Sequence, residues 1–286
     1  MSKGIAVALG MFDSVHIGHE AVISGVLNSP YRSTVITFDK LPNKTGGIVL
    51  SNEEKIKKLL ATGVDTVEIM NFDEVKEMTP SEFLDMLTSE GFVKRIACGF
   101  NFHFGKNAEG DTDFIRQYCE KKGIEFFLAD EVSVGGETVS ATYIKKLLSE
   151  GKIEAANELL GEPFGFTTTV IKGDGRGKKL GFPTANQIYP ESKAPLAAGV
   201  YHTRITIGLK TFDAVTDIGT RPTFRRDIVC AESYIINFSG DCYGKEVKIV
   251  FLERIRDEKK FSTVEKLTEE IAKNVQYVIN KSKSEL

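Results

Sequence analysis

The sequence predicts a chain of two folded parts, an α/β domain of Rossmann-like type with a parallel sheet and then a small antiparallel β-barrel with a terminal helix. The chain has 286 residues, and at about 150 residues per domain this length suggests two domains. In the first half, predicted strands and helices alternate, which is typical of a parallel, doubly wound sheet. In the second half, strands follow one another closely before one long helix, which is typical of a small barrel.

The first half opens with the apolar run 5–10, which predicts a buried strand, and a helix is expected to follow it to about residue 27. Ser51 and Glu54 have the spacing of a capping box, so another helix is expected after them. The Thr-Pro pair at 79–80 suits the start of a further helix. The other elements expected here are the strands 34–38, 67–70, 95–99 and 125–128 and the helix 112–121.

Two short helices, 141–150 and 153–160, are expected next, because Gly151 and Gly161 stand where helix C-caps belong. The segment 161–165 contains two glycines and a proline and breaks the helical pattern. We therefore predict domains of residues 1–161 and 162–286.

The second half is expected to be mainly antiparallel. Gly208 and Leu209 separate two apolar runs and predict a tight hairpin loop. A single long helix is expected over residues 263–279. The predicted strands are 166–172, 199–207, 210–218, 229–238 and 247–254.

Charge is distributed unevenly along the chain, although 37 Lys and Arg against 40 Asp and Glu leave a formal net charge of only −3. Residues 1–161 hold 17 basic and 24 acidic side chains, and residues 162–286 hold 20 basic and 16 acidic ones. The basic half could bind nucleic acid or a small phosphorylated ligand. Chance variation between two solvated surfaces is the alternative.

The composition, with 41% hydrophobic residues, supports ordinary folded cores and argues against disorder. No run of about 18 apolar residues occurs, so no membrane helix is expected, and the first residues do not resemble a secretory signal. The cysteines form no C-x-x-C pair, which favours a reducing, cytoplasmic location. They are Cys98, Cys119, Cys230 and Cys242.

A first candidate site follows the first strand, where His16 and His19 flank Gly18 at a probable helix N-terminus. Free backbone N–H groups and the helix dipole favour phosphate there. A glycine lets a ligand approach the backbone closely, and imidazoles can donate hydrogen bonds to a phosphoryl group in its transition state. Two helix histidines with ordinary structural partners are the alternative.

The stretch 10–19 resembles the nucleotidylyltransferase signature G-x-F-D-x-x-H-x-G-H, as found in bacterial bifunctional riboflavin kinase/FMN adenylyltransferases (FAD synthetases). Three later stretches are similar to motifs of the same family. They are 99–105 (Gly-Phe-Asn-Phe-His-Phe-Gly), 139–145 (Val-Ser-Ala-Thr-Tyr-Ile-Lys) and 160–164 (Leu-Gly-Glu-Pro-Phe).

The resemblance implies adenylyl transfer, in which the phosphate of FMN attacks the α-phosphorus of ATP and releases pyrophosphate. His16 and His19 would act on the ATP phosphates, and Asn101 and Phe104 would bind the flavin substrate. The other residues that the resemblance assigns to ATP here are Gly10, Phe12, Asp13, Gly18, Ser140, Thr142 and Lys145.

Four positions depart from the family pattern. Ser14 stands where the family usually has Gly, and Leu41 stands where its T-F-x-P-H-P motif has a histidine. Ala141 replaces a serine, and Lys145 replaces an arginine, which keeps the charge but loses the bidentate fork. Because losing one transition-state donor costs about 10²–10³ in rate, these changes could leave the first half slow or inactive, and a monofunctional riboflavin kinase with a degenerate first half is the alternative.

A second candidate site is the glycine-rich stretch 173–186, which contains Arg176, Lys178 and Lys179 but no Walker P-loop. Such a backbone can wrap phosphates with its N–H groups. Thr184 and Asn186, two residues apart on an extended segment, would face the same way and could hold Mg²⁺ and a phosphate oxygen. A flexible surface loop is the alternative.

This stretch resembles the riboflavin kinase signature G-x-x-x-G-r-x-L-G-F-P-T-A-N without departure at its Pro-Thr-x-Asn core. Five later stretches also resemble motifs of that family. They are 199–201 (Gly-Val-Tyr), 218–224 (Ile-Gly-Thr-Arg-Pro-Thr-Phe), 231–234 (Ala-Glu-Ser-Tyr), 243–245 (Tyr-Gly-Lys) and 256–261 (Arg-Asp-Glu-Lys-Lys-Phe).

The second resemblance implies that Glu232 is the base for the 5′-hydroxyl of riboflavin and that Mg²⁺ and ATP are required. Thr184 and Asn186 would bind the metal and the nucleotide, with Gly173, Gly177 and Lys179 as further ATP-binding residues. A loop that carries Arg256, Glu258 and Phe261 would close over the flavin; an exposed charged turn is the alternative.

The leading hypothesis is therefore an enzyme that converts riboflavin to FMN and FMN to FAD, without nucleic-acid or membrane partners. A small barrel that binds nucleic acid, with a ligand-sensing α/β domain, is the remote alternative. It is disfavoured because no aromatic side chains are interleaved on a basic strand face, the usual platform for stacked bases.

Overall fold

The computed structural model describes residues 4–40, 46–222 and 227–284, with only the backbone described at positions 222 and 227. Contacts divide the chain into two compact units, Met1–Tyr143 and Ile144–Leu286. Helix α6 (Ala141–Ser149) crosses this division. A domain boundary after Gly161 stays a prediction, and each unit is described by itself.

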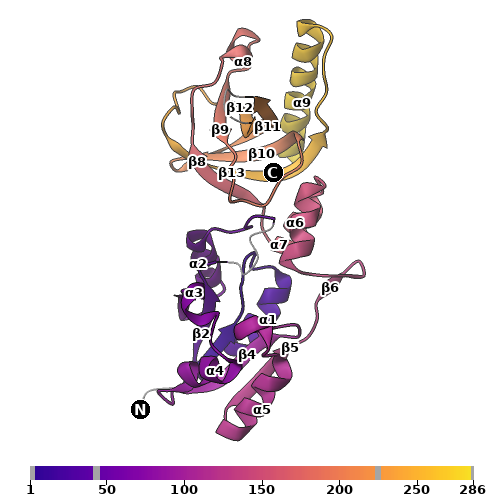
Figure 1. Ribbon diagram of the computed structural model, residues 1–286. Helices are drawn as coiled ribbons and strands as arrows, with labels where there is room; N and C mark the ends of the chain where they lie inside the picture. The colour runs from indigo at the N-terminus through magenta and orange to yellow at the C-terminus, as the bar shows by residue number, and fades with distance from the viewer. Residues whose placement is uncertain (1–3, 41–45, 223–226, 285–286) are drawn as a thin grey trace. The chain divides into compact units, whose positions relative to one another are not determined.

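The first unit contains a five-stranded sheet in the order β3-β2-β1-β4-β5, and each neighbouring pair is parallel (Figure 1). This confirms the predicted doubly wound sheet. The order reverses between β1 and β4, and ligands of such sheets bind at that point, beyond the carboxyl ends of the strands. The strands are β1 (Ile5–Leu9), β2 (Arg32–Phe38), β3 (Thr66–Met70), β4 (Val93–Gly99) and β5 (Glu125–Ala129).

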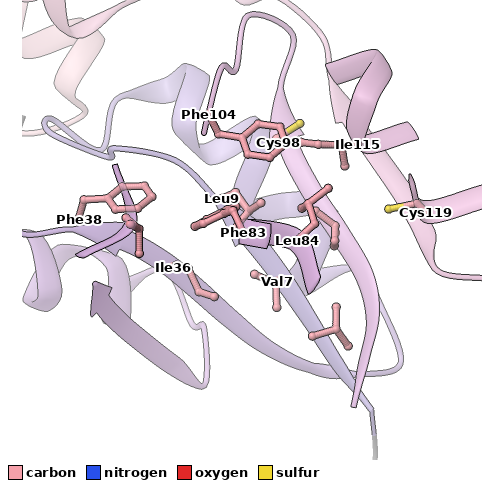
Figure 2. Packing of buried hydrophobic residues seen from close by; sticks show 13 residues of the cluster. Val7, Leu9, Ile36, Phe38, Phe83, Leu84, Cys98, Phe104, Ile115 and Cys119 are labelled. Carbon is pink, nitrogen blue, oxygen red and sulfur yellow. The ribbon is translucent and has the colours of Figure 1, made fainter. Parts of the chain in front are cut away.

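Helices cover both faces of this sheet, so the central strand β1 is buried on two sides. Val7 and Leu9 point into a cluster with Leu84 of α4 and Ile115 of α5 (Figure 2). Ala8 belongs to the opposite cluster, which α1 and α2 cover. The helices are α1 (Ile17–Leu27), α2 (Asn52–Ala61), α3 (Phe72–Val75), α4 (Pro80–Thr88), α5 (Thr112–Lys122) and the 3₁₀ turn η1 (Lys106–Ala108).

Helices α2 and α4 begin at the capping residues that the sequence predicted. Ser51 and Glu54 form a complete capping box at α2, and Thr79 caps α4 with Pro80 at its first turn. Gly161 ends α7 (Ile153–Leu160) in the left-handed conformation. The sequence reading did not predict the short helix α3, nor the small hairpin of β6 (Ser133–Val134) and β7 (Glu137–Thr138).

Two imidazoles cap helix α1. The amide of His19 donates to Nδ1 of His16 over 3.1 Å, and the amide of His16 donates to Nδ1 of His19 over 3.3 Å. The rings stack with their centroids 3.7 Å apart. Burial lowers the pKa of His16 to about 4, and burial together with the neighbouring His16 and Lys58 lowers the pKa of His19 well below its usual value. Both rings are therefore neutral at pH 7.

The second unit contains a six-stranded antiparallel sheet in the order β8-β13-β10-β11-β12-β9 (Figure 1). Its edge strands meet, because the Gln187 amide donates to the Thr168 hydroxyl over 3.0 Å and Ile171 bridges Asn186. The predicted barrel is thus confirmed. The strands are β8 (Gly165–Thr169), β9 (Thr184–Ile188), β10 (Gly199–Ile207), β11 (Lys210–Pro222), β12 (Asp227–Ile235) and β13 (Glu246–Arg256).

The predicted hairpin loop is confirmed, since Ile207 pairs with Lys210 around Gly208 and Leu209. Strand β9 was expected only as an extended segment, not as a sixth strand, and the four-residue helix α8 (Arg176–Lys179) was not predicted. Both lie in the glycine-rich stretch, where glycines and Pro183 obscure periodicity.

Buried hydroxyls pin the register of three barrel strands. Thr203 of β10 bonds Thr216 of β11 over 2.6 Å, and Thr216 bonds Ser233 of β12 over 2.8 Å. All three are fully buried. The opposite face of these strands packs against α9 (Val264–Ser284), whose Val278 lies in a cluster with Val200 and Val215.

We expect the pH dependence of stability to reveal the neutral imidazole cap. The His16 pKa of about 4 lies below its usual 6.5, so the unfolded chain binds a proton that the folded chain does not as the pH falls. The free energy of unfolding should therefore drop by about 2 kcal/mol between pH 7 and pH 5 from this group alone.

His16→Asn is the matched variant, because asparagine is also a good N-cap but does not titrate. Amide hydrogen exchange of β1 and β4 at the two pH values measures the unfolding free energy of the first unit. The variant should show a smaller drop than the natural chain, and an equal drop in both would contradict the assignment.

Candidate functional site

A large cavity of about 820 Å³ lies in the first unit, lined by the segments that follow the carboxyl ends of β1 and β4. Leu9 and Gly10 line it from the end of β1, and Gly99 and Asn101 line it from the end of β4. This is the position that the sheet topology predicts for a ligand.

The histidine pair lines this cavity. Because each Nδ1 accepts a backbone hydrogen bond, the single proton of each neutral ring lies on Nε2. The two Nε2–H groups are left as neutral donors for a ligand. An oxyanion in the cavity would thus meet two hydrogen-bond donors whose state does not change near pH 7.

The loop between β1 and α1 is strained. Phe12 and Val15 have positive φ angles of 46° and 43°, and both are fully buried. Such a conformation costs of the order of 1–3 kcal/mol per residue and is typical of functional sites. A Cβ on Gly10 would lie 2.9 Å from the Phe12 ring, and one on Gly18 would lie 3.0 Å from Cε1 of His16. These glycines make room for the two rings.

Aromatic side chains form much of the cavity wall. Phe102 and Phe104 stack with their centroids 5.8 Å apart, and Phe83 lies 5.6 Å from Phe104. Flat conjugated rings pack well on such walls. Phe12 and Phe104 were predicted as site residues, whereas Phe83 and Phe102 were not. The other lining phenylalanines are Phe12, Phe38, Phe72 and Phe100.

Most residues predicted for this half line the cavity. They are Gly10, Phe12, His16, Gly18, His19, Asn101, Phe104 and Ser140. The structure does not place Asp13 or Thr142 in the lining: Asp13 is buried, and its Oδ1 accepts from the Val49 amide over 3.2 Å. Lys145 belongs to the second compact unit, and Leu41 lies outside the described residues.

A buried lysine near the histidines was not predicted. Lys55 is only 4% exposed, and its ammonium donates to the carbonyl of Phe38 over 2.7 Å. Burial lowers its pKa to about 8, although Asp13 and Asp39 act in the opposite direction. In the sequence, Lys55 stands in a charged helix run and looks like a surface residue.

The second candidate site is a row of residues across the barrel strands. Asn186 of β9 lies opposite Glu232 of β12, and Glu232 lies opposite Asp217 of β11. Asp217 in turn lies opposite Val200 of β10, which pairs with Arg256 of β13. Directly paired residues share one face of a sheet. The structure therefore brings Asn186, Glu232 and Arg256, three predicted site residues, into one row.

The glycine-rich stretch lies against the β9 end of this row. The Asn186 amide approaches the Thr184 hydroxyl at 3.4 Å, so the two side chains face the same way as predicted. A Cβ on Gly173 would lie 2.6 Å from Nδ2 of Asn186, and one on Gly177 would lie 2.4 Å from the Phe182 carbonyl. Glycine is thus required for the close approach of the loop.

Neutral oxygens such as those of Thr184 and Asn186 are donors that Mg²⁺ accepts. Within residues 4–40, 46–222 and 227–284, no group of three or more His, Cys, Asp and Glu side chains could hold a metal ion. A magnesium ion at this edge would therefore need further oxygens from a bound nucleotide.

Glu232 forms an ion pair with Arg221, a residue not predicted for the site. The Arg221 guanidinium also lies 3.9 Å from Asp174 in the glycine-rich stretch. Asp174 in turn lies 3.2 Å from Arg176. Arg221 stands in the 218–224 motif, but Thr223 and Phe224 of that motif lie outside the described residues.

The segment after β13 is held against α9. Nε of Arg256 lies 3.4 Å from Glu270 of α9, and its guanidinium lies over the Phe261 ring at 5.7 Å. Glu258 lies above β11, since a Cβ on Gly219 would meet its Oε1 at 2.4 Å. The three predicted residues of this segment thus gather beside the row.

Asp217 is the carboxylate in the row that sequence reasoning missed. Burial and the charge of Glu258 raise its pKa to about 6, while Arg256 and Arg221 act in the opposite direction. No local signal marks it, because only the strand register places it next to Glu232.

All four cysteines are free and buried, and burial raises their pKa values. None of them belongs to the cavity or the row as a nucleophile. Among the described helices, none combines the length and apolar character needed to span a bilayer.

Two family models match separate parts of the chain. The FAD synthetase model matches residues 1–143, which include the cavity, and the riboflavin kinase model matches residues 160–281, which include the row. Each match therefore covers one candidate site.

Full-length relatives are similar to the whole chain. The bifunctional riboflavin kinase/FMN adenylyltransferase of Listeria monocytogenes is 33% identical, over 94% of this chain and 90% of the relative. The proteins of the same description from Bacillus subtilis and Escherichia coli are 31% and 30% identical, over 96% and 95% of this chain and 91% of each relative.

A crystal structure described as a macrolide-efflux protein from Streptococcus pneumoniae is also similar, with a TM-score of 0.88 and 26% identity. It aligns over 98% of this chain and 94% of that one. Both family models and the full-length relatives agree with each other and with the two sites described above. This chain belongs to the family of bifunctional riboflavin kinases/FMN adenylyltransferases.

Proposed function

We propose that this chain phosphorylates riboflavin to FMN with ATP and then adenylylates FMN to FAD with a second ATP. The observation that carries the proposal is that each half has both its own family match and its own candidate site. A monofunctional riboflavin kinase with a degenerate first half is not favoured, because the FAD synthetase model matches that half.

In the kinase half, Glu232 accepts the proton of the riboflavin 5′-hydroxyl as that oxygen attacks the γ-phosphorus of ATP. Arg221 forms an ion pair with the Glu232 carboxylate. When the hydroxyl binds to Glu232, the Arg221 side chain must move away or remain beside it. Positioning supplies most of the rate, as in other phosphoryl transfers. The glycine-rich stretch with Gly173, Gly177 and Lys179 wraps the ATP phosphates.

Thr184 and Asn186 would hold a magnesium ion together with the nucleotide. When bound, the ion offsets negative charge on the phosphoryl group that is transferred. The support for this assignment is the chemistry of the two side chains, which lie together at the edge of the row.

In the adenylyltransferase half, the Nε2–H groups of His16 and His19 donate to the ATP phosphates. Phe104 and the neighbouring rings pack on the isoalloxazine ring of FMN, and Asn101 binds a polar group of the same substrate. Ser140 lines the cavity as a further donor. No covalent intermediate on the enzyme is needed, because FMN itself is the nucleophile.

The absent family histidine at position 41 and the changes at Ser14, Ala141 and Lys145 leave fewer donors than the family pattern provides. The two neutral imidazoles and Ser140 remain in the lining of the cavity. We infer that adenylyl transfer proceeds at this site with these groups. A cytoplasmic location is part of the proposal, supported by four free thiols.

Substitution of Glu232 tests its proposed role as the kinase base. Glu232→Gln should abolish FMN formation from riboflavin and ATP, because the amide cannot accept the proton, and it should leave FMN-to-FAD conversion unchanged. Chromatography of flavins from parallel reactions with riboflavin and with FMN measures both steps. Glu246→Gln, an exposed carboxylate on β13, is the control and should retain both activities; loss of both activities in Glu232→Gln would refute separate sites.

Substitution of His19 tests the proposed role of the histidine pair as hydrogen-bond donors. His19→Ala should slow FAD formation about 10²–10³-fold, because a transition-state donor is lost, and leave FMN formation unchanged. His19→Glu keeps an acceptor at the third position of the helix and so preserves the capping box, but its ionised carboxylate has no proton to donate.

If the cap alone mattered, His19→Glu would keep the natural rate of FAD formation, and the donor role would be wrong. If the natural chain converted neither riboflavin nor FMN, the proposed function itself would be overturned.

A further inference from the structure

We propose that Asp217 is a substrate-binding residue of the kinase site, whose carboxylate accepts hydrogen bonds from the ribityl hydroxyls of riboflavin. The inference rests on the proposed kinase function and assigns a role to a residue that no sequence motif marked.

The strand register gives the direction in which the substrate must lie. The phosphate-binding groups stand at the β9 end of the row, at Asn186, and the proposed base Glu232 stands on the next strand. Riboflavin must therefore place its reacting hydroxyl at Glu232 and extend away from β9. The next position along the row is Asp217.

The spacing fits the length of a ribityl chain. Neighbouring strands are about 4.8 Å apart, and Cβ atoms of directly opposite residues are about 5 Å apart. With C–C bonds of about 1.5 Å, a five-carbon chain that starts at Glu232 covers about one strand spacing. Its hydroxyls then lie over Asp217, and the ring lies beyond it toward Arg256 and Phe261.

The surroundings of Asp217 favour a ligand that brings hydrogen-bond donors. Its carboxylate is partly buried, and its pKa is raised by burial and by Glu258 without any hydrogen bond as an opposing cause. The nearby cations have other partners, Arg221 on Glu232 and Arg256 on Glu270. Hydrogen bonds to a half-buried carboxylate are stronger than those between neutral groups, so donors on a ligand would be favourable here.

The negative charge of the acidic side chains around Asp217 indicates which class of ligand binds there. Asp217, Glu232 and Glu258 would repel an anion, and no described group of acidic side chains here could hold a metal ion. A neutral polyol satisfies carboxylates with O–H donors and brings no charge of its own. The ribityl chain is such a polyol.

The test compares two flavins that share a ring, riboflavin and lumiflavin, which has a methyl group in place of the ribityl chain. Their dissociation constants are measured by flavin fluorescence on the full-length chain, with ADP and Mg²⁺ present. The variants are Asp217→Leu, which cannot hydrogen-bond, and Asp217→Asn, which keeps one acceptor oxygen. Glu246→Gln serves as the exposed-carboxylate control.

Asp217→Leu should weaken riboflavin binding about 10- to 100-fold, because hydrogen bonds to a charged group are lost, and leave lumiflavin binding unchanged. Asp217→Asn should show a smaller loss, seen in turnover as a raised KM with little change in kcat. Thermal unfolding of each variant confirms that the barrel is folded.

An equal loss for the two flavins would overturn the assignment, because Asp217 would then act on the ring or on the fold. Unchanged riboflavin binding in Asp217→Leu would overturn it as well. Failure of the proposed kinase function would be seen in the unsubstituted chain, which would then neither bind riboflavin nor form FMN.

Discussion

The register of the barrel strands is the constraint on which the proposed kinase site depends. A slip of one residue turns every side chain of a strand to the opposite face. The buried hydroxyls of Thr203, Thr216 and Ser233 bond to one another on one face of the strands. Because these bonds hold the pairing register, they also determine which side chains lie next to each other on the opposite face, where Asp217 pairs with Glu232. The chemistry of the outer face is thus set by polar contacts that no substrate reaches.

In the adenylyltransferase half, the hydrogen-bond donors come from a turn and not from the face of a sheet. There the same two imidazoles close the helix and line the cavity. Because each Nδ1 is engaged by the backbone, the ring orientation and the tautomer are decided together. The strained backbone at Phe12 and Val15 is tolerated because both side chains are buried in the same core.

Sequence reasoning predicted most of the architecture because its signals were local. The capping pair Ser51 and Glu54, the Thr-Pro start at 79–80 and the hairpin at 208–209 act within a few residues. Features that depend on distant pairing were missed. Asp217 matters only once β11 is paired with β12, and the burial of Lys55 depends on the distant Phe38 carbonyl that its ammonium contacts. Strand β9 was obscured by the glycines and proline around it.

The neutral imidazole cap has a consequence for how this half responds to acid. The donors of the site remain in one protonation state far below the pH at which a free histidine changes. The same shift draws protons to the unfolded chain and so weakens the fold. Acidification would therefore not titrate the active site gradually. It would instead lower the stability of this half, in which each folded molecule keeps its two imidazole donors, so that the response of this half to acid is set by folding.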